Sequence, residues 1–175
     1  TNSIQQQFKS LEAIGSQIDG DIEATVKQVN DLSRQIAAVN NEIVRSKGLG
    51  DNPNDLMDRR DHLVEKLSQL INVTVVQNDP DEFMVHTDGQ IIVQGSLARQ
   101  IETVPQINNN GYSKLVWSDT KIDAHFNGGS LGALVELRDK DIRNQIQSLN
   151  TMAVNFADLV NDVHRNAVGA NNVTG

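Results

Sequence analysis

The chain has 175 residues, of which 38% are hydrophobic, and it carries a net charge of −8 at pH 7 and no cysteine. Binding to nucleic acid or to an acidic membrane needs a basic surface, so this charge balance argues against both. The absence of cysteine excludes disulfides and cysteine-ligated metals. No run of 18 apolar residues is present, so we expect no membrane insertion.

A heptad repeat of apolar residues runs through residues 4–43. The pattern predicts one long helix that ends near Lys47, with Gly48 as a left-handed C-cap. Its apolar edge must be covered by other helices. The helix contributes seven residues to a predicted bundle seam: Ile18, Ile22, Val29, Leu32, Ile36, Val39 and Ile43.

A second helix is expected near residues 53–71. Asn52 fits its N-cap and Pro53 its first position. Leu63 and Leu67 extend the bundle seam, and Arg60 occupies one seam position in place of an apolar residue. Local pairing of charges accounts for the acidic and basic residues around Arg60.

From residue 72 the apolar period changes to two, which predicts strands. We expect strands at residues 73–76, 83–87, 91–93, 112–117 and 121–126, with a hairpin turn at Asp88-Gly89. The segment between the third and fourth strands is polar and is expected to be a loop. Five short strands make a small antiparallel lobe that needs the helices for support.

A third helix is predicted from Ser130 to about Arg165. Five apolar residues spaced seven apart supply a second seam, namely Val135, Ile142, Leu149, Phe156 and Val163. The expected fold is α+β, a three-helix bundle with two long heptad helices and the antiparallel lobe inserted before the last helix. The expected domains are a discontinuous bundle at 1–71 and 128–166, a β subdomain at 72–127 and a loop tail at 167–175.

The polar back of the first helix is rich in amides rather than charges. Amides lose less free energy than charges when an interface forms, so this face can contact another subunit, although a merely solvated face would look the same. The predicted assembly surface comprises Gln17, Gln28, Gln35, Asn40, Asn41, Arg59 and Arg60.

No pattern in the chain indicates catalysis. The four histidines, His62, His86, His125 and His164, fall in four different predicted elements without metal-ligand spacing. Phosphate-binding glycine loops and nucleophile motifs are missing from the sequence, and Gly128-Gly129 is expected to be a flexible joint. We therefore predict neither an enzyme, nor a cofactor, nor a metal site.

Several blocks together resemble one known family. The stretch Asp55-Leu56-Met57-Asp58-Arg59-Arg60-Asp61-His62-Leu63-Val64 is similar to the signature of the bacterial flagellar hook-associated protein 1 family, the first hook–filament junction proteins. Residues 88–95, 128–139 and 149–164 are similar to later blocks of the same family, in the same order. The resemblance covers nearly the whole chain, as a central fragment without the family's terminal regions.

The resemblance implies a structural subunit that leaves the cell by the flagellar type III route and lies outside it, or in the periplasm where flagella are internal. The implied partners are copies of itself in a ring, the hook protein, the second hook–filament junction protein, and an export chaperone that binds terminal segments absent here. The alternative function is a coiled-coil adaptor or signalling module that binds a partner helix through the seam.

Overall fold

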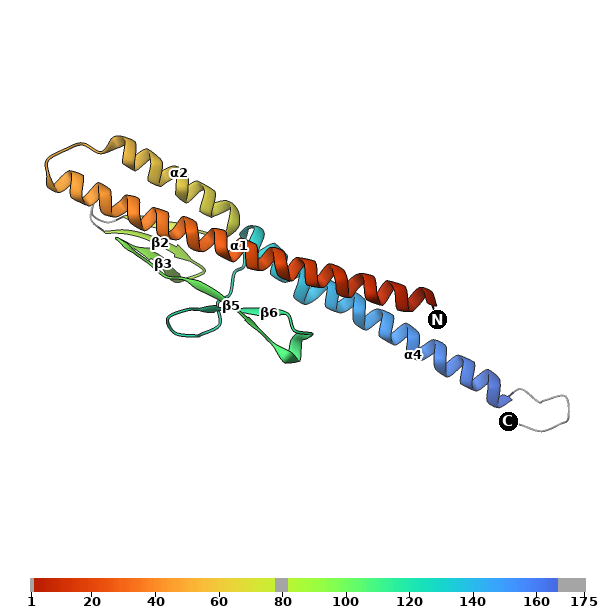
Figure 1. The fold of residues 1–175 in the computed structure, drawn as a ribbon. Helices are drawn as coiled ribbons and strands as arrows, with labels where there is room; N and C mark the ends of the chain where they lie inside the picture. Colours follow the sequence, from red (N-terminus) through yellow and green to blue (C-terminus); the bar gives the residue numbers. More distant parts are fainter. Residues whose placement is uncertain (1, 78–81, 167–175) are drawn as a thin grey trace. The chain divides into compact units, whose positions relative to one another are not determined.

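The computed structural model describes residues 2–77 and 82–166 and shows an α+β fold, as predicted (Figure 1). The expected loop tail at 167–175 lies outside the described residues. The helices are α1 (Asn2–Gly48), α2 (Asn54–Leu70), α3 (Gly129–Glu136) and α4 (Arg143–Asn166), with a π-helical stretch (Leu137–Ile142) before α4 and a 3-10 turn (Ile107–Asn109). The strands are β1 (Thr74–Gln77), β2 (Phe83–Thr87), β3 (Gln90–Gln94), β4 (Leu97–Ala98), β5 (Ile101–Pro105) and β6 (Ser113–Trp117).

The chain divides into two compact units. The helical unit contains residues 1–17 and 137–175, and the mixed unit contains residues 18–136. This division places the strands in one unit with α2 and most of α1. Side-chain hydrogen bonds join β5 and β6 to α1 within this unit. The discontinuous bundle at 1–71 and 128–166 and the β subdomain at 72–127 stay predictions.

The end of α1 is fixed by a glycine two residues later than expected. Gly50, with φ of 87°, is the left-handed residue, and Gly48 is still helical. The Asp51 amide donates to the Ser46 carbonyl at 3.1 Å and the Gly50 amide donates to the Lys47 carbonyl at 2.9 Å. These two bonds form a Schellman motif, which satisfies the last carbonyls of the helix.

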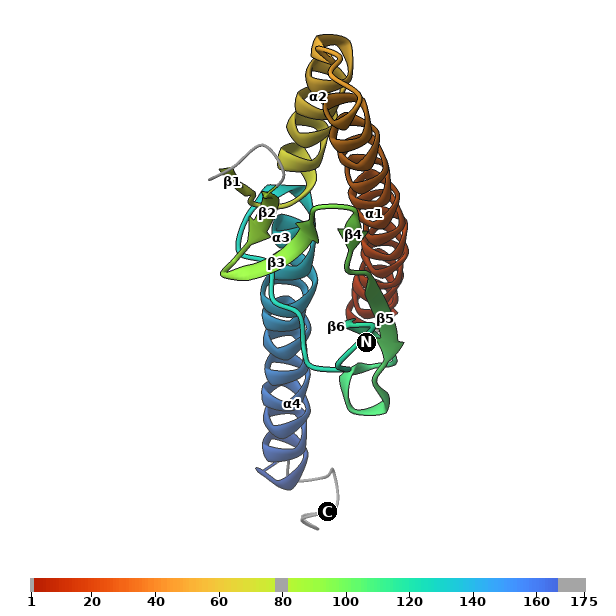
Figure 2. The same ribbon diagram turned by 90° about the vertical axis from the view of Figure 1, so that its left-hand side faces the viewer.

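Within the mixed unit, α2 lies beside the C-terminal half of α1 (Figures 1 and 2). Heptad residues of both helices are fully buried here, namely Ile36 and Ile43 of α1 and Leu67 of α2. Burying a side chain of this size stabilises the fold by about 1.5–3 kcal/mol. The predicted start of α2 is one residue early, because Pro53 stands at the N-cap and Asn54 is the first helical residue.

Four strands form an antiparallel sheet in the order β1-β2-β3-β4. The predicted hairpin turn joins β2 and β3, and its residues Asp88 and Gly89 have φ of 45° and 81°. Positive φ at both central residues is the type I′ turn that suits the twist of paired strands. The buried face of β2 carries Phe83, Val85 and Thr87, which places the strand in the core.

Strands β5 and β6 pair separately as a two-stranded antiparallel ribbon. The sequence missed β5, because Ile101–Pro105 includes Glu102 and a proline and lacks a clear alternation. The strand predicted at 121–126 is wrong: this segment makes one isolated bridge, between Asp123 and Val116. The ribbon and the four-stranded sheet replace the single lobe that the sequence suggested.

Two side chains of α1 hold the ribbon. The Asn30 amide pairs with the backbone of Ile101, donating to its carbonyl at 2.8 Å and accepting from its N–H at 2.9 Å. Near the other end of the ribbon, the Ser113 amide donates to the Asp19 carboxylate at 3.0 Å. The Asn30 side chain therefore hydrogen-bonds to the backbone of β5 as a neighbouring strand would.

Replacing Asn30 with alanine should lower the free energy of unfolding by about 1–3 kcal/mol, because both backbone groups of Ile101 lose their partner. Chemical denaturation measures this loss, and the Ile101 amide should exchange its hydrogen faster. Asn41→Ala is the matched control, since Asn41 is an exposed amide on the same helix. An equal, small effect of both substitutions would contradict the role assigned to Asn30.

The predicted third helix is interrupted. Its first part, α3, is followed by six π-helical residues before α4 begins at Arg143. The π-helical stretch contains Arg138, which is 2% exposed and whose Nε donates to the Asp139 carboxylate at 2.7 Å. Heptad spacing alone does not reveal such an insertion, because the apolar residues on both sides keep their period.

The glycine pair Gly128-Gly129 at the start of α3 packs tightly against the end of α2, whereas the sequence suggested a flexible joint. A Cβ added to Gly129 would lie 2.4 Å from the carbonyl carbon and oxygen of Leu70, and Gly129 has φ of 69°. Only glycine fits both this space and this backbone conformation. The contact brings the start of α3 against the end of α2.

Candidate assembly surfaces

The structure buries most of the predicted bundle seam. Leu32, Val135 and Leu149 are half-buried. The buried residues are Ile18, Ile22, Val29, Ile36, Val39, Ile43, Leu63, Leu67 and Ile142. The packing of all three helices into one bundle stays a prediction.

The expected burial of Phe156 and Val163 is wrong for the described residues, because these side chains are 52% and 62% exposed. Helix α4 extends beyond the N-terminus of α1 within the helical unit (Figures 1 and 2). Its last turns therefore lie beside no other helix of that unit. The sequence repeat predicted the helix face correctly but gave no information about what covers it.

Two members of the predicted assembly surface are also placed wrongly, because Asn40 and Arg60 are 0% and 2% exposed. Arg60 Nη1 donates to Asn40 Oδ1 at 3.1 Å, and the guanidinium carbon lies 3.9 Å from the centre of the Phe83 ring. Burial lowers the pKa of the Arg60 guanidinium, while the Asp61 carboxylate raises it. Arg60 and Asn40 join α2 to α1 and cannot contact another subunit.

The other five members are exposed, namely Gln17, Gln28, Gln35, Asn41 and Arg59. Four of them are uncharged amides on α1. An amide face can form hydrogen bonds to a neighbouring molecule without removing ionised groups from water. We call these five residues the amide surface; Gln17 belongs to the helical unit and the other four belong to the mixed unit. The amide surface is the first candidate for assembly.

A second candidate, which we call the apolar stripe, lies on α4. Its residues are separated by three or four positions, which places them on one face of the helix. They are 43–62% exposed and comprise Met152, Phe156, Leu159, Val160 and Val163. A contiguous apolar surface of this kind typically marks a contact with another protein segment.

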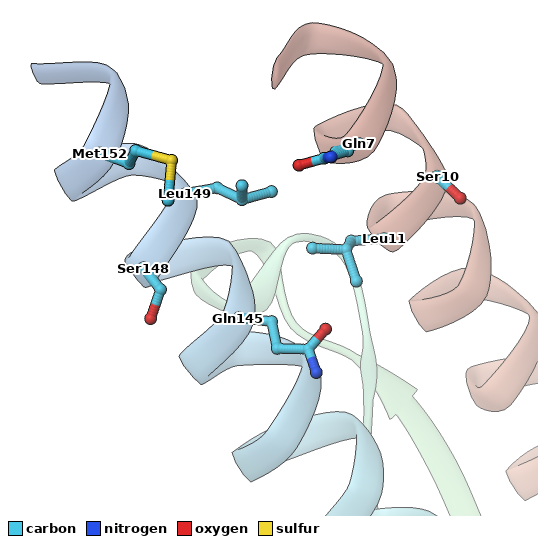
Figure 3. A pocket seen from close by; sticks show the side chains of 7 residues that line it. All are labelled: Gln7, Ser10, Leu11, Gln145, Ser148, Leu149 and Met152. Carbon is cyan, nitrogen blue, oxygen red and sulfur yellow. The ribbon is translucent and has the colours of Figure 1, made fainter. Parts of the chain in front are cut away.

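The apolar stripe continues into a groove between α4 and the first turns of α1, with a volume of about 390 Å³. Figure 3 shows Leu11 and Leu149 pointing toward each other across this groove. Its remaining lining residues are uncharged, namely Gln7, Ser10, Gln145, Ser148 and Met152. An open groove between two helices with apolar walls and amide rims has the chemistry to accept a further amphipathic helix.

Two kinds of feature are absent from the described residues. In residues 2–77 and 82–166, no three His, Asp or Glu side chains gather closely enough to hold a metal ion. Within the same ranges, no helix combines the length and the apolar character that a membrane crossing requires.

Comparison with known proteins decides the family. A family model described as the flagellar hook-associated protein FlgK helical domain matches residues 1–175. The chain belongs to this family. The match includes both units and both candidate surfaces, so all the residues discussed above are part of one FlgK helical domain.

Individual relatives agree with the FlgK assignment. The chain is similar to flagellar hook-associated protein 1 of Escherichia coli K12, with 32% identity over 168 residues, and to that of Bacillus subtilis 168, with 27% identity over 188 residues. It also resembles the solved structure of the flagellar hook junction protein FlgK from Burkholderia pseudomallei, with a TM-score of 0.76 and 29% identity.

These alignments cover 91% of this chain for both sequence relatives and 96% for the solved structure. They cover 31%, 37% and 33% of the respective relatives. The chain thus spans about a third of the length of these FlgK proteins. The fold and the family are shared, while the activity of a whole FlgK protein has to be argued separately.

Proposed function

We propose that this chain is part of a structural subunit of the bacterial flagellum, which forms the junction between hook and filament by packing against other subunits. The names of its relatives support this function. The observation on this chain that supports it most directly is the apolar stripe on α4. A subunit that acts by assembly must present surfaces that are completed by other segments or molecules. The stripe and its groove are such a surface.

The proposal extends to partners and location. The amide surface, made of Gln17, Gln28, Gln35, Asn41 and Arg59, contacts copies of the protein in a ring, the hook protein or the second junction protein. An export chaperone binds segments outside this chain. The protein is extracellular on the flagellum, or periplasmic where flagella are internal, and it performs no catalysis.

Deleting the gene that encodes this chain tests the proposal. We expect cells with hooks that lack filaments, and restoration by the full-length gene, as seen by electron microscopy of isolated flagella. Antibody against this chain should label the boundary between hook and filament. The alternative function, an adaptor that binds a partner helix away from the flagellum, predicts normal flagella in the deletion strain.

Substitutions on α4 test the apolar stripe itself. Phe156→Ser combined with Val163→Ser in the full-length protein should reduce its amount in isolated flagella at least fivefold, because apolar contact area is lost. Val154→Ser is the matched control, since Val154 is 58% exposed and lies outside the stripe. Equal incorporation of both variants would show that the stripe has no part in assembly.

A further inference from the structure

The tip of the β5–β6 ribbon presents one apolar side chain on a well-defined loop. Ile107 is 96% exposed at the start of the 3-10 turn. The loop is closed by backbone hydrogen bonds, from the Gln106 amide to the Tyr112 carbonyl at 3.1 Å and from the Tyr112 amide to the Asn109 carbonyl at 2.9 Å. A side chain displayed on an ordered loop loses little conformational entropy when it binds.

The loop is also uncharged. No acidic or basic residue occurs in residues 103–113, and residues 106–110 consist of Ile107 and four amides. The whole chain carries a net charge of −8. Two copies of such a chain repel each other, and this repulsion is weakest where the contacting surfaces lack carboxylates. The ribbon tip meets this condition for contact with a second copy.

A shallow, open depression that suits this tip lies elsewhere on the surface of the mixed unit. It has a volume of about 410 Å³ and lies between α1 and the β4 region. We call it the alanine pocket; it is lined by Arg34, Ala37, Ala38, Ser96, Ala98 and Gln100. None of these residues is acidic, and small side chains leave room for a branched aliphatic one.

The rim of the alanine pocket complements the ribbon tip. Leu97 lies between the lining residues Ser96 and Ala98 in the sequence. It is 73% exposed and adds apolar surface to the rim. Arg34 is held beside the pocket, since its Nη1 donates to Gln100 Oε1 at 2.6 Å and its Nη2 pairs with Asp31. Exposed guanidinium and amide donors on the rim match the amide carbonyls that surround Ile107.

We propose that Ile107 of one copy inserts into the alanine pocket of a second copy of this chain. The two surfaces are different, so the contact is heterologous and repeats from copy to copy, which is the geometry that builds rings. The inference rests on the proposed self-association and adds the residues that would make it. Insertion of one apolar anchor into a small pocket is the usual arrangement of an interface hot spot.

Cysteine cross-linking tests the contact directly. The chain contains no cysteine, so Ile107→Cys and Ala38→Cys can be placed in two separate full-length proteins, each without other cysteines. After mixing, assembly and mild oxidation, we expect disulfide-linked dimers that contain one protein of each kind. Each protein alone should give at least tenfold less dimer, because identical positions do not meet in a heterologous contact.

Substitution provides an independent test. Ile107→Asn and Ala38→Lys should each weaken self-association of the full-length protein at least tenfold in sedimentation. Leu49→Asn and Ala24→Lys are the matched controls, since Leu49 is an exposed leucine in a loop and Ala24 an exposed alanine on α1. Unchanged thermal unfolding of all four variants would show that the fold is intact.

The outcomes separate the two proposals. Mixed dimers together with weaker association of both test variants support the contact. If the full-length protein self-associates but neither mixed dimers nor weaker association is found, the contact is wrong while the assembly function stands. If the unsubstituted protein does not self-associate even in isolated flagella, the proposed ring fails and the contact fails with it.

Discussion

Replacing Gly129 with alanine should lower the free energy of unfolding by about 3 kcal/mol or more. The new Cβ would lie 2.4 Å from the Leu70 carbonyl and 2.5 Å from the Ile71 nitrogen, both of which are backbone groups that cannot rotate away. The positive φ of Gly129 adds strain for any side chain. Overpacking costs about 1–3 kcal/mol where side chains can adjust, so a backbone collision lies at or above that range.

Gly20→Ala is the matched control for this prediction. Nothing lies within 4 Å of a Cβ at Gly20, which is in the interior of α1. The substitution should stabilise the fold by about 0.5–1 kcal/mol, since alanine favours the helix. Urea denaturation followed by circular dichroism measures both variants. A loss below about 1 kcal/mol for Gly129→Ala would mean that α2 and α3 can separate at little cost.

Replacing Arg60 with alanine should destabilise the mixed unit by about 3 kcal/mol. The substitution leaves a cavity beside Phe83 and removes the donor that satisfies Asn40 Oδ1. An unsatisfied buried polar group costs about 1–3 kcal/mol, and the lost cation–π contact adds to this. Arg60 Nη2 also lies 3.4 Å from Gln77 Oε1, so β1 loses a contact with α2.

Two variants show which property of Arg60 matters. Arg59→Ala should change stability by less than about 0.5 kcal/mol, since Arg59 is exposed. Arg60→Met keeps the aliphatic stem against Phe83 and should recover part of the loss. The same denaturation measurement applies to all three. Equal stability of Arg60→Ala and Arg59→Ala would show that the buried arginine contributes nothing to the fold.

The long helices and the β2–β3 hairpin were predictable because their signals are local. Heptad spacing from Ile18 to Ile43 defines a helix face without reference to any partner. The Asp88-Gly89 turn is specified by two residues that tolerate positive φ. The α+β class and the family resemblance follow from the same local patterns, read in order along the chain.

Other features were not predictable from local patterns. Strand β5 takes its hydrogen bonds from β6 and from Asn30, and Asn30 lies 71 residues away from Ile101 in the sequence. The sequence around an amide such as Asn40 is the same whether its side chain faces solvent or the buried Arg60. The exposure expected for the candidate assembly surface was therefore predicted correctly only for the residues that no other element covers, and a role of those residues in assembly stays a prediction.

The sequence by itself determined which residues form helices, which face of each helix is apolar, and the family to which the chain belongs. Only the tertiary structure decided which of those faces are covered. Val39 and Phe156 occupy equivalent positions in their heptads, yet one is 3% and the other 52% exposed. Periodicity follows from the geometry of a single helix, whereas burial depends on which other segment lies beside it.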